Sequence, residues 1–331
     1  MIYAGTSVVD VRKTAPPIGS GVVRTFNFSD PSKLGGDYAA NFGTIPGTSA
    51  NPLIDPTVKY KGQSTLRFDI PSMSGANAGG NWFGNFSSDL KTQFGAGDHF
   101  SVEVVTMWNQ ALFDTVFMAE NLVNGKPVPG TIQQAGTKLF DINFGDEPNN
   151  GLHHYSSAGG KLVVQTRYAA KMPILYAYDS HSNNAPFESP LPPYDFNLQN
   201  GMPSPFCLYS NARGKTGAIA GCFNIVPLKW MRWKLDVSLG PLGVDASGFP
   251  VWRNNHIQFF GAVEDAPYRQ IFDWKPTTPG YFDWRACDDD KTKTLKIGKV
   301  WAFPYITAKD TTQKHDLCQA WYGPITISRL T

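Results

Sequence analysis

The stretch that decides the fold is WMRWKLDVS, at residues Trp230–Ser238. In an extended strand successive side chains point to opposite faces, so a period of two divides them into two sets. The odd-numbered set is apolar and consists of Trp233, Leu235 and Val237. The even-numbered set is Trp230, Arg232, Lys234 and Asp236. One packed face and one solvated face are typical of antiparallel sheets, whereas buried parallel strands are apolar throughout.

The same alternation recurs along the chain in short runs that end in Gly, Pro, Asn or Asp clusters. The predicted strands are Val22–Phe28, Ser64–Ile70, Phe100–Trp108, Lys138–Phe144, Lys161–Tyr168, Trp230–Ser238, His256–Ala262, Gln270–Trp274, Leu295–Tyr305 and Ile325–Leu330. Only Ser87–Phe94 and Ala111–Asn121 are compatible with a helix, and we expect one or two short turns there. Two antiparallel sheets packed face to face form a sandwich. We therefore predict an all-β, two-sheet sandwich with long loops and few short helices.

The composition excludes several classes of protein. Of the 331 residues, 32 are Gly and 25 are Pro, which leaves few windows long enough for a helical bundle. With 41% hydrophobic and 17% charged residues, the chain has enough apolar surface to fold. The net charge of +2 predicts neither a nucleic-acid nor an anionic-membrane partner. No apolar stretch reaches the roughly 18 residues of a membrane span, so we expect no membrane insertion.

The first 20 residues differ from the rest. Residues 1–20 carry few large apolar groups and end in APPIGS, which predicts an extended N-terminal arm. Residues 21–331 are predicted to form one sandwich domain. The N-terminus also lacks the basic start and apolar core of a secretory signal. We expect either that a signal has been removed or that the protein reaches its destination without one.

The most distinctive sequence motifs lie in the C-terminal third of the chain. Its segments are KVWAFPYITAKD at Lys299–Asp310, QKH at Gln313–His315, WY at Trp321–Tyr322 and ITISR at Ile325–Arg329. Upstream, CLY at Cys207–Tyr209 and GCF at Gly221–Phe223 precede the strand at Trp230. Together these segments resemble concanavalin A-like jelly-roll proteins related to polysaccharide lyases. Such proteins occur in bacteria and among bacteriophage virion proteins.

That resemblance implies a curved jelly roll whose concave face holds an extended glycan. Such a groove needs planar polar groups to bind hydroxyls or carboxylates and aromatic rings to cover sugar faces. The predicted glycan-binding residues are Gln165, Arg167, Trp230, Arg232, Lys234, His256, Gln258, Tyr305 and Trp321. The alternative is a solvated strand face with rings that cover the rim of the sandwich.

A lyase acting on uronic acids must neutralise the sugar carboxylate, remove a proton and protonate the leaving oxygen. The residues that could do this are Tyr305, His315, Gln313, Arg167 and His256. For the C-terminal loop we favour the interpretation that Lys309, Gln313 and His315 hold the loop together. Hydrolysis would need a pair of carboxylates, and the sequence identifies none.

The four cysteines, Cys207, Cys222, Cys287 and Cys318, lack the spacing of a zinc site. The simplest of three connectivities pairs 207 with 222 and 287 with 318, which would suit a protein that works outside the cell. We predict no cofactor and no metal site, although Asp288–Asp290 could offer oxygens to a structural Ca²⁺.

These observations favour a non-enzymatic protein of the virion surface, a decoration or fibre-like protein that is located on the virion or outside the cell. Its arm would bind other virion proteins, its sandwich would bind a cell-surface glycan, and it would form homo-oligomers. The first alternative is a secreted or virion-borne polysaccharide lyase. The second is a purely structural capsid cement protein.

Overall fold

The computed structural model describes most of the chain from residue 21 onward. The described residues are 21–29, 48–50, 52–72, 75–80, 82–85, 93–117, 122–123, 126–127, 136–144, 161–167, 171–178, 218, 220–277, 281, 283–287, 290–302 and 304–331. The predicted arm, residues 1–20, lies outside these ranges. Within them no helix has the length and hydropathy that a membrane span requires.

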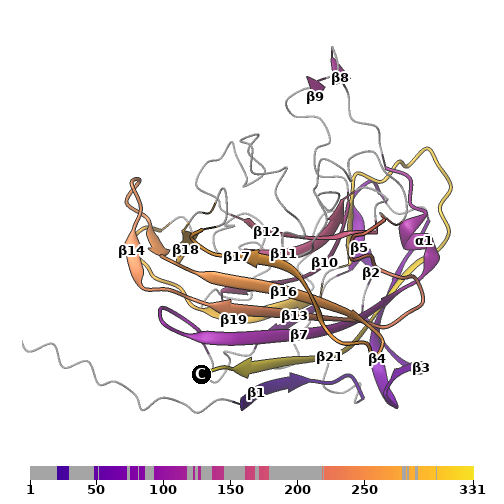
Figure 1. Ribbon diagram of the computed structural model, residues 1–331. Coiled ribbons are helices and arrows are strands. Elements are labelled where there is room, and N and C mark those ends of the chain that lie inside the picture. Colours follow the sequence, from indigo (N-terminus) through magenta and orange to yellow (C-terminus); the bar gives the residue numbers. More distant parts are fainter. Residues whose placement is uncertain are drawn as a thin grey trace, which may run out of the picture.

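Sheet A has eight strands, all antiparallel (Figure 1). In spatial order they are β17 (Arg269–Trp274), β16 (His256–Val263), β13 (Met231–Ser238), β7 (His99–Trp108), β21 (Cys318–Arg329), β4 (Gln63–Ile70) and β3 (Leu53–Tyr60). The eighth strand, β1 (Gly21–Phe26), also pairs with β21. The strand that decided the prediction, β13, therefore lies inside the sheet.

Sheet B also has eight strands and packs against sheet A. Its order is β12 (Pro173–Tyr178), β11 (Lys161–Arg167), β10 (Gly136–Phe144), β20 (Tyr305–Thr307), β5 (Ala78–Gly80) and β2 (Thr48–Ala50). In addition, β19 (Ile297–Ala302) pairs with β10 and with β6 (Trp82–Asn85). The smaller elements are β14 (Leu242–Val244), β15 (Pro250–Trp252), β18 (Trp284–Arg285), β8 (Leu122–Val123), β9 (Lys126–Pro127) and α1 (Gln110–Phe113).

The core lies between the two sheets and is built by the alternating side chains. Trp233, Leu235 and Val237 of β13 are fully buried, and they share one cluster with Phe140 and Ile142 of β10. Burial of each such side chain contributes about 1.5–3 kcal/mol, so the alternation itself drives the packing. The predicted two-sheet antiparallel sandwich is confirmed.

Two predicted strands differ from the structure by more than a shift of one or two residues at an end. The predicted Leu295–Tyr305 is divided into β19 and β20, because Pro304 has no backbone N–H with which to continue the ladder. The predicted Ile325–Leu330 is the second half of β21, which begins at Cys318. A shift of register between Tyr322 and Ile325 lets this strand pass through Gly323–Pro324.

The helix-compatible window Ala111–Asn121 contains only the short helix α1. Asn109 caps its N-terminus, where the side-chain oxygen accepts a hydrogen bond from the backbone N–H of Leu112. The helix ends at Phe113, and Thr115 bonds its hydroxyl to the carbonyl of Ala111. Of the other window, Ser87–Phe94, residues 87–92 lie outside the described residues.

Candidate functional site

The predicted site residues divide between the two outer faces of the sandwich. On the outer face of sheet A, with Trp230 directly before β13, are Trp230, Arg232, Lys234, His256, Gln258 and Trp321. On sheet B, in β11 and β20, are Gln165, Arg167 and Tyr305. Gln313 and His315 lie in the loop between β20 and β21. Because the core separates the two faces, the predicted residues cannot form one site.

Ion pairs occupy the outer face of sheet A. Asp236 is 2.6 Å from His99 and 3.3 Å from Lys234, and Asp273 is 2.6 Å from His256 and 2.8 Å from Lys275. Burial alone would raise the pKa of Asp273, but hydrogen bonds from Lys275 and His256 outweigh it and hold that pKa below its ordinary value. The Asp273 carboxylate is therefore an ionised acceptor for Lys275 and His256.

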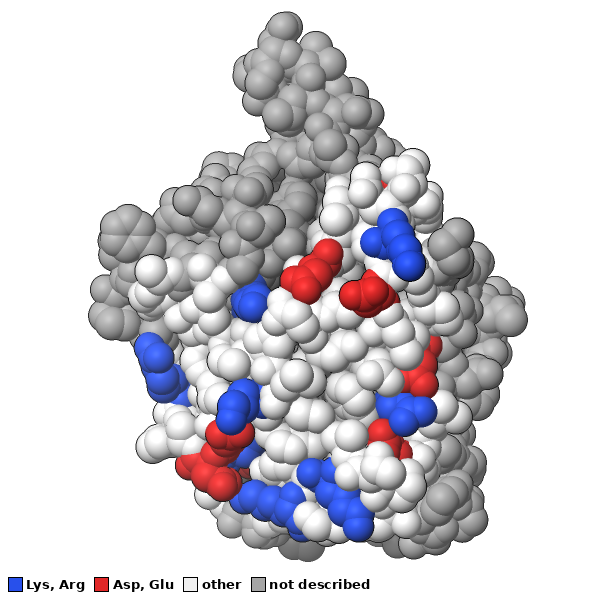
Figure 2. Space-filling model, turned by 90° about the vertical axis from the view of Figure 1, so that its right-hand side faces the viewer, with Lys and Arg blue, Asp and Glu red and all other residues white. Residues whose placement is uncertain are grey.

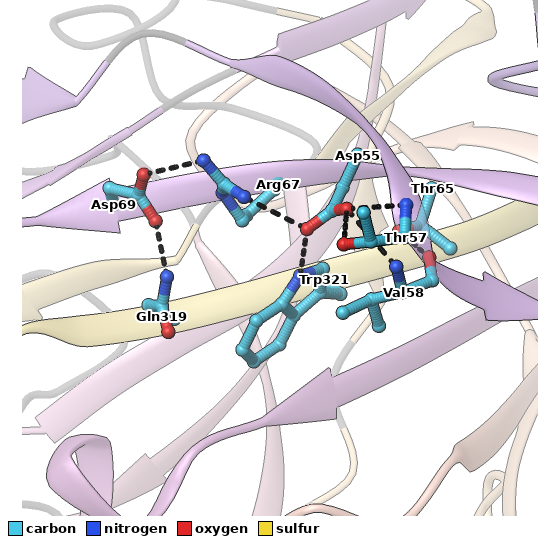
Figure 3. A network of polar contacts seen from close by, with 8 residues as sticks. All are labelled: Asp55, Thr57, Val58, Thr65, Arg67, Asp69, Gln319 and Trp321. Atoms are coloured by element: carbon cyan, nitrogen blue, oxygen red, sulfur yellow. Dashed lines mark hydrogen bonds and ion pairs between the residues drawn. The ribbon is translucent and has the colours of Figure 1, made fainter.

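Trp321 belongs to a buried polar network at the β4 side of the same face (Figure 3). Its indole N–H donates to Asp55 Oδ2 at 3.0 Å, and Arg67 donates to the same carboxylate oxygen at 2.9 Å. Asp55 is 2% exposed and also accepts hydrogen bonds from Thr57 and Val58, which together hold its pKa well below the usual range against the effect of burial. With the ring 6% exposed, Trp321 stabilises this network.

Arg232 and Trp230 lie at the other side of the face, next to the turn between β16 and β17. The guanidinium of Arg232 donates to the carbonyls of Glu264 and Ala266 and lies 4.8 Å from the ring centre of Tyr268. The ring of Trp230 contacts the ring of Tyr60 edge to face. Arg232 thus stabilises the turn, and the aromatic rings are held beside it.

On sheet B, Lys138 and Tyr305 come together across neighbouring strands. The ammonium of Lys138 lies 5.5 Å from the ring centre of Tyr305, which is 6% exposed. In the β10–β11 ladder, Gln165 pairs with Lys138 and Arg167 pairs with Gly136. The structure describes the backbone of Gln165 and Arg167 but not their side chains. Their backbone positions lie on the strand next to Lys138. Three of the predicted site residues are therefore grouped around one lysine.

Further along the same face, β10 and β19 bring buried polar side chains together. Asp141 pairs with Trp301, and Asn143 pairs with Lys299. All four are at most 4% exposed, and they alternate with the core residues Ile142 and Val300. The amide oxygen of Asn143 accepts from the N–H of Phe144 at 2.9 Å, whereas its Nδ2 has no hydrogen-bond partner.

The sequence did not single out Lys138, Asp141, Asn143 or Lys299 as site residues. The sequence did contain a signal for them. In the predicted strands Lys138–Phe144 and Leu295–Tyr305, charged side chains alternate with core residues. Lysine ammonium groups bind anions, so Lys138 can bind a carboxylate beside the phenol of Tyr305.

Gln313 and His315 are bound within their own loop. His315 is 5% exposed; its ring Nε2 lies 2.8 Å from the carbonyl of Asp310, and its backbone N–H donates to Ser72. The backbone N–H of Gln313 also donates to that carbonyl of Asp310. Nearby, Lys309 donates to the carbonyl of Ser72, and burial lowers its pKa. These contacts hold the loop to the residues that follow β4.

The predicted bridge between Cys287 and Cys318 is wrong, because both are buried free cysteines. Cys287 lies beside the carbonyl of Pro250 next to β15, whereas Cys318 begins β21 and contacts Thr115. Cys222 is not a free thiol, but Cys207 lies outside the described residues, and their pairing stays a prediction.

Asp290 closes a turn by accepting hydrogen bonds from Thr292 and Lys293, which lower its pKa to about 2. Asp288 and Asp289, the other predicted Ca²⁺ candidates, lie outside the described ranges. Within those ranges no three His, Cys, Asp or Glu side chains are grouped as metal ligands. Figure 2 shows acidic and basic side chains interspersed on the end of the molecule that it presents, without a large patch of like charge among the described residues.

No protein-family model and no curated protein matches the sequence. Solved structures of similar fold include the marine PL-14 alginate lyase from Aplysia kurodai, with 12% identity, a TM-score of 0.48 and coverage of 93% of this chain and 98% of that one. The endo-β-1,4-glucuronan lyase from the fungus Trichoderma reesei has 9% identity, a TM-score of 0.43 and coverage of 85% and 88%. The globular domain of T. cruzi calreticulin has 10% identity, a TM-score of 0.42 and coverage of 93% and 87%.

Proposed function

We propose that the outer face of sheet B binds a uronic-acid glycan and cleaves it by β-elimination. The observation that carries the proposal is the contact between Lys138 and Tyr305, with Gln165 and Arg167 at flanking positions of the neighbouring strand. These are the residue types that the reaction requires: cations and amides for the sugar carboxylate, and a phenol for proton transfer.

In the proposed reaction, Lys138 and Arg167 neutralise the uronate carboxylate, which makes the proton on the adjacent ring carbon more acidic. Tyr305, as phenolate, removes that proton. The electron pair forms the new carbon–carbon double bond, and the bond to the glycosidic oxygen breaks. Tyr305, now protonated, returns the proton to the leaving oxygen.

Charge supports an acidic substrate. The described charged side chains of this face are two lysines, Lys138 and Lys299, and one carboxylate, Asp141. Because Lys299 and Asp141 are almost completely buried, their charges act in a medium that screens them weakly. Lys138, the partly exposed cation of this set, can bind the carboxylate of an acidic glycan, which a neutral glycan lacks.

The test is incubation with alginate, glucuronan and heparin-like glycans, with the unsaturated product followed by its ultraviolet absorbance. Tyr305→Phe keeps the ring but removes the hydroxyl, and we expect it to lower kcat by at least about a hundredfold. The matched control is Tyr268→Phe on sheet A, which should keep full activity. If no acidic glycan yields product, or if Tyr305→Phe is as active as the parent, the proposal fails.

The non-enzymatic virion role, the arm's partners and homo-oligomerisation stay predictions from the sequence. They concern contacts with other molecules and residues 1–20, which lie outside the described residues. A lyase site is compatible with a location on a particle surface, but it would replace the non-enzymatic assignment.

A further inference from the structure

Three aromatic rings that the proposed reaction does not use lie together at one end of the outer face of sheet A. Tyr60 ends β3, Trp230 precedes β13 and Tyr268 precedes β17, and all three are partly exposed. The rings of Tyr60 and Trp230 have centroids 5.3 Å apart and planes inclined by 68°. Two rings at this angle form a corner, with one ring face and one ring edge turned toward each other.

The β3–β4 hairpin places Tyr60 over the sheet. Lys61 and Gly62 both have positive φ, 47° and 82°, as a tight two-residue hairpin turn requires. Although β3 and β17 are the two edges of the seven-strand path, Lys61 Nζ lies 3.1 Å from Asp265 Oδ1 in the turn before β17. A Cβ on Gly323 would lie 3.3 Å from the Cβ of Tyr60, so the glycine lets the tyrosine lie close to β21. The β3–β4 hairpin and the turn before β17 therefore meet beside the outer face of sheet A.

The rings are held in place before any ligand arrives. The hydroxyl of Tyr268 donates to Glu103 at 3.2 Å, and the guanidinium of Arg232 lies against the same ring. Burial and the Glu103 carboxylate raise the pKa of Tyr268, so its phenol stays protonated and remains a donor. By contrast with Trp274, which packs against the core, Tyr60 and Trp230 are not members of the core cluster. Fixed rings lose little conformational entropy on binding.

Charges around the rings are balanced. Lys61 is paired with Asp265, and Lys229 with Glu264 at 2.9 Å; the side chains of both pairs are at least half exposed. Such groups can bond hydroxyls without favouring an anion. Sugar rings present apolar C–H faces to aromatic rings and hydroxyls to polar rims. We propose that the aromatic corner of Tyr60, Trp230 and Tyr268 binds a neutral hexopyranose chain, as a second glycan site that is independent of the lyase reaction proposed above.

The experiment is native electrophoresis in gels that contain hydroxyethylcellulose or galactomannan as neutral polymers. We expect the full chain to be retarded, and Trp230→Ala to bind at least roughly tenfold more weakly. Trp274→Ala, which removes a tryptophan from the other end of sheet A, should be retarded like the parent. Tyr60→Ala is the second variant, because this side chain lies at a hairpin tip and its loss should leave the core intact.

Two outcomes would overturn the proposal: no retardation of the parent by either neutral polymer, or unchanged retardation of both Trp230→Ala and Tyr60→Ala. The lyase proposal is tested by separate measurements. Tyr305→Phe should still be retarded by the neutral polymers, and Trp230→Ala should still cleave any acidic glycan that the parent cleaves.

Discussion

The two outer faces of the sandwich differ in the arrangement of their charged side chains. On sheet A, Arg67, Lys234 and Lys275 each lie within 3.3 Å of a carboxylate. On sheet B, the described charged groups are two lysines and one aspartate, and they are mostly buried. Paired charges in contact with solvent stabilise a surface a little and leave little attraction for a charged ligand. This comparison is the basis on which we propose an acidic glycan for sheet B and a neutral one for sheet A.

The largest effect that we expect concerns the stability of sheet A. Asp55→Ala removes the acceptor of Trp321, Arg67, Thr57 and Val58, and it leaves buried donors without a partner. We expect a loss of about 3–5 kcal/mol in the free energy of unfolding. Urea denaturation followed by tryptophan fluorescence measures it. Asp69→Ala, at the more exposed end of the network, is the control and should cost about 1 kcal/mol.

Acid should weaken the same network. Because the folded pKa of Asp55 lies below its unfolded value of about 3.9, its stabilisation is complete above that pH and is lost as the pH falls below it. We expect the urea midpoint to fall between about pH 4 and pH 2, and to fall less in Asp55→Asn. An equal fall in both proteins would show that other carboxylates cause the acid sensitivity.

One lysine on each face gives a matched pair of variants, which tests whether the acidic glycan is cleaved on sheet B. Lys138→Ala should lower kcat/KM on an acidic glycan by about ten- to a hundredfold, because it removes a cation from the carboxylate and from Tyr305. Lys234→Ala, its counterpart on sheet A, should leave kcat/KM unchanged. Equal losses in the two variants would mean that the faces do not differ as we infer.

The smallest effect should come from His256, which the sequence offered as a lyase residue. Its ring pairs with Asp273 on sheet A, where both side chains are partly exposed. His256→Ala should change stability by less than about 1 kcal/mol and leave lyase activity intact. Loss of activity on this substitution would move the reaction to sheet A.

The sequence predicted the two β-sheets more accurately than the candidate binding sites. Alternation in Trp230–Ser238 is a local property, so it correctly gave the buried face of β13. In contrast, Lys138 and Tyr305 meet only because β10 pairs with β20, and no local pattern fixes which strands become neighbours. Trp321 shows a second limit: a strand pattern places its ring outward, but Asp55, far away in the sequence, binds its N–H and helps to bury it. Likewise, β3 was missed because Pro56 and a shift of register interrupt its alternation.

The most direct test of the two-face account is a crystal structure of the Tyr305→Phe variant with a uronic-acid tetrasaccharide. We expect the sugar on the outer face of sheet B, with a carboxylate within hydrogen-bond distance of Lys138 and the ring of residue 305 beside the scissile bond. A tetrasaccharide bound on sheet A, between His256 and the aromatic corner, would contradict the account.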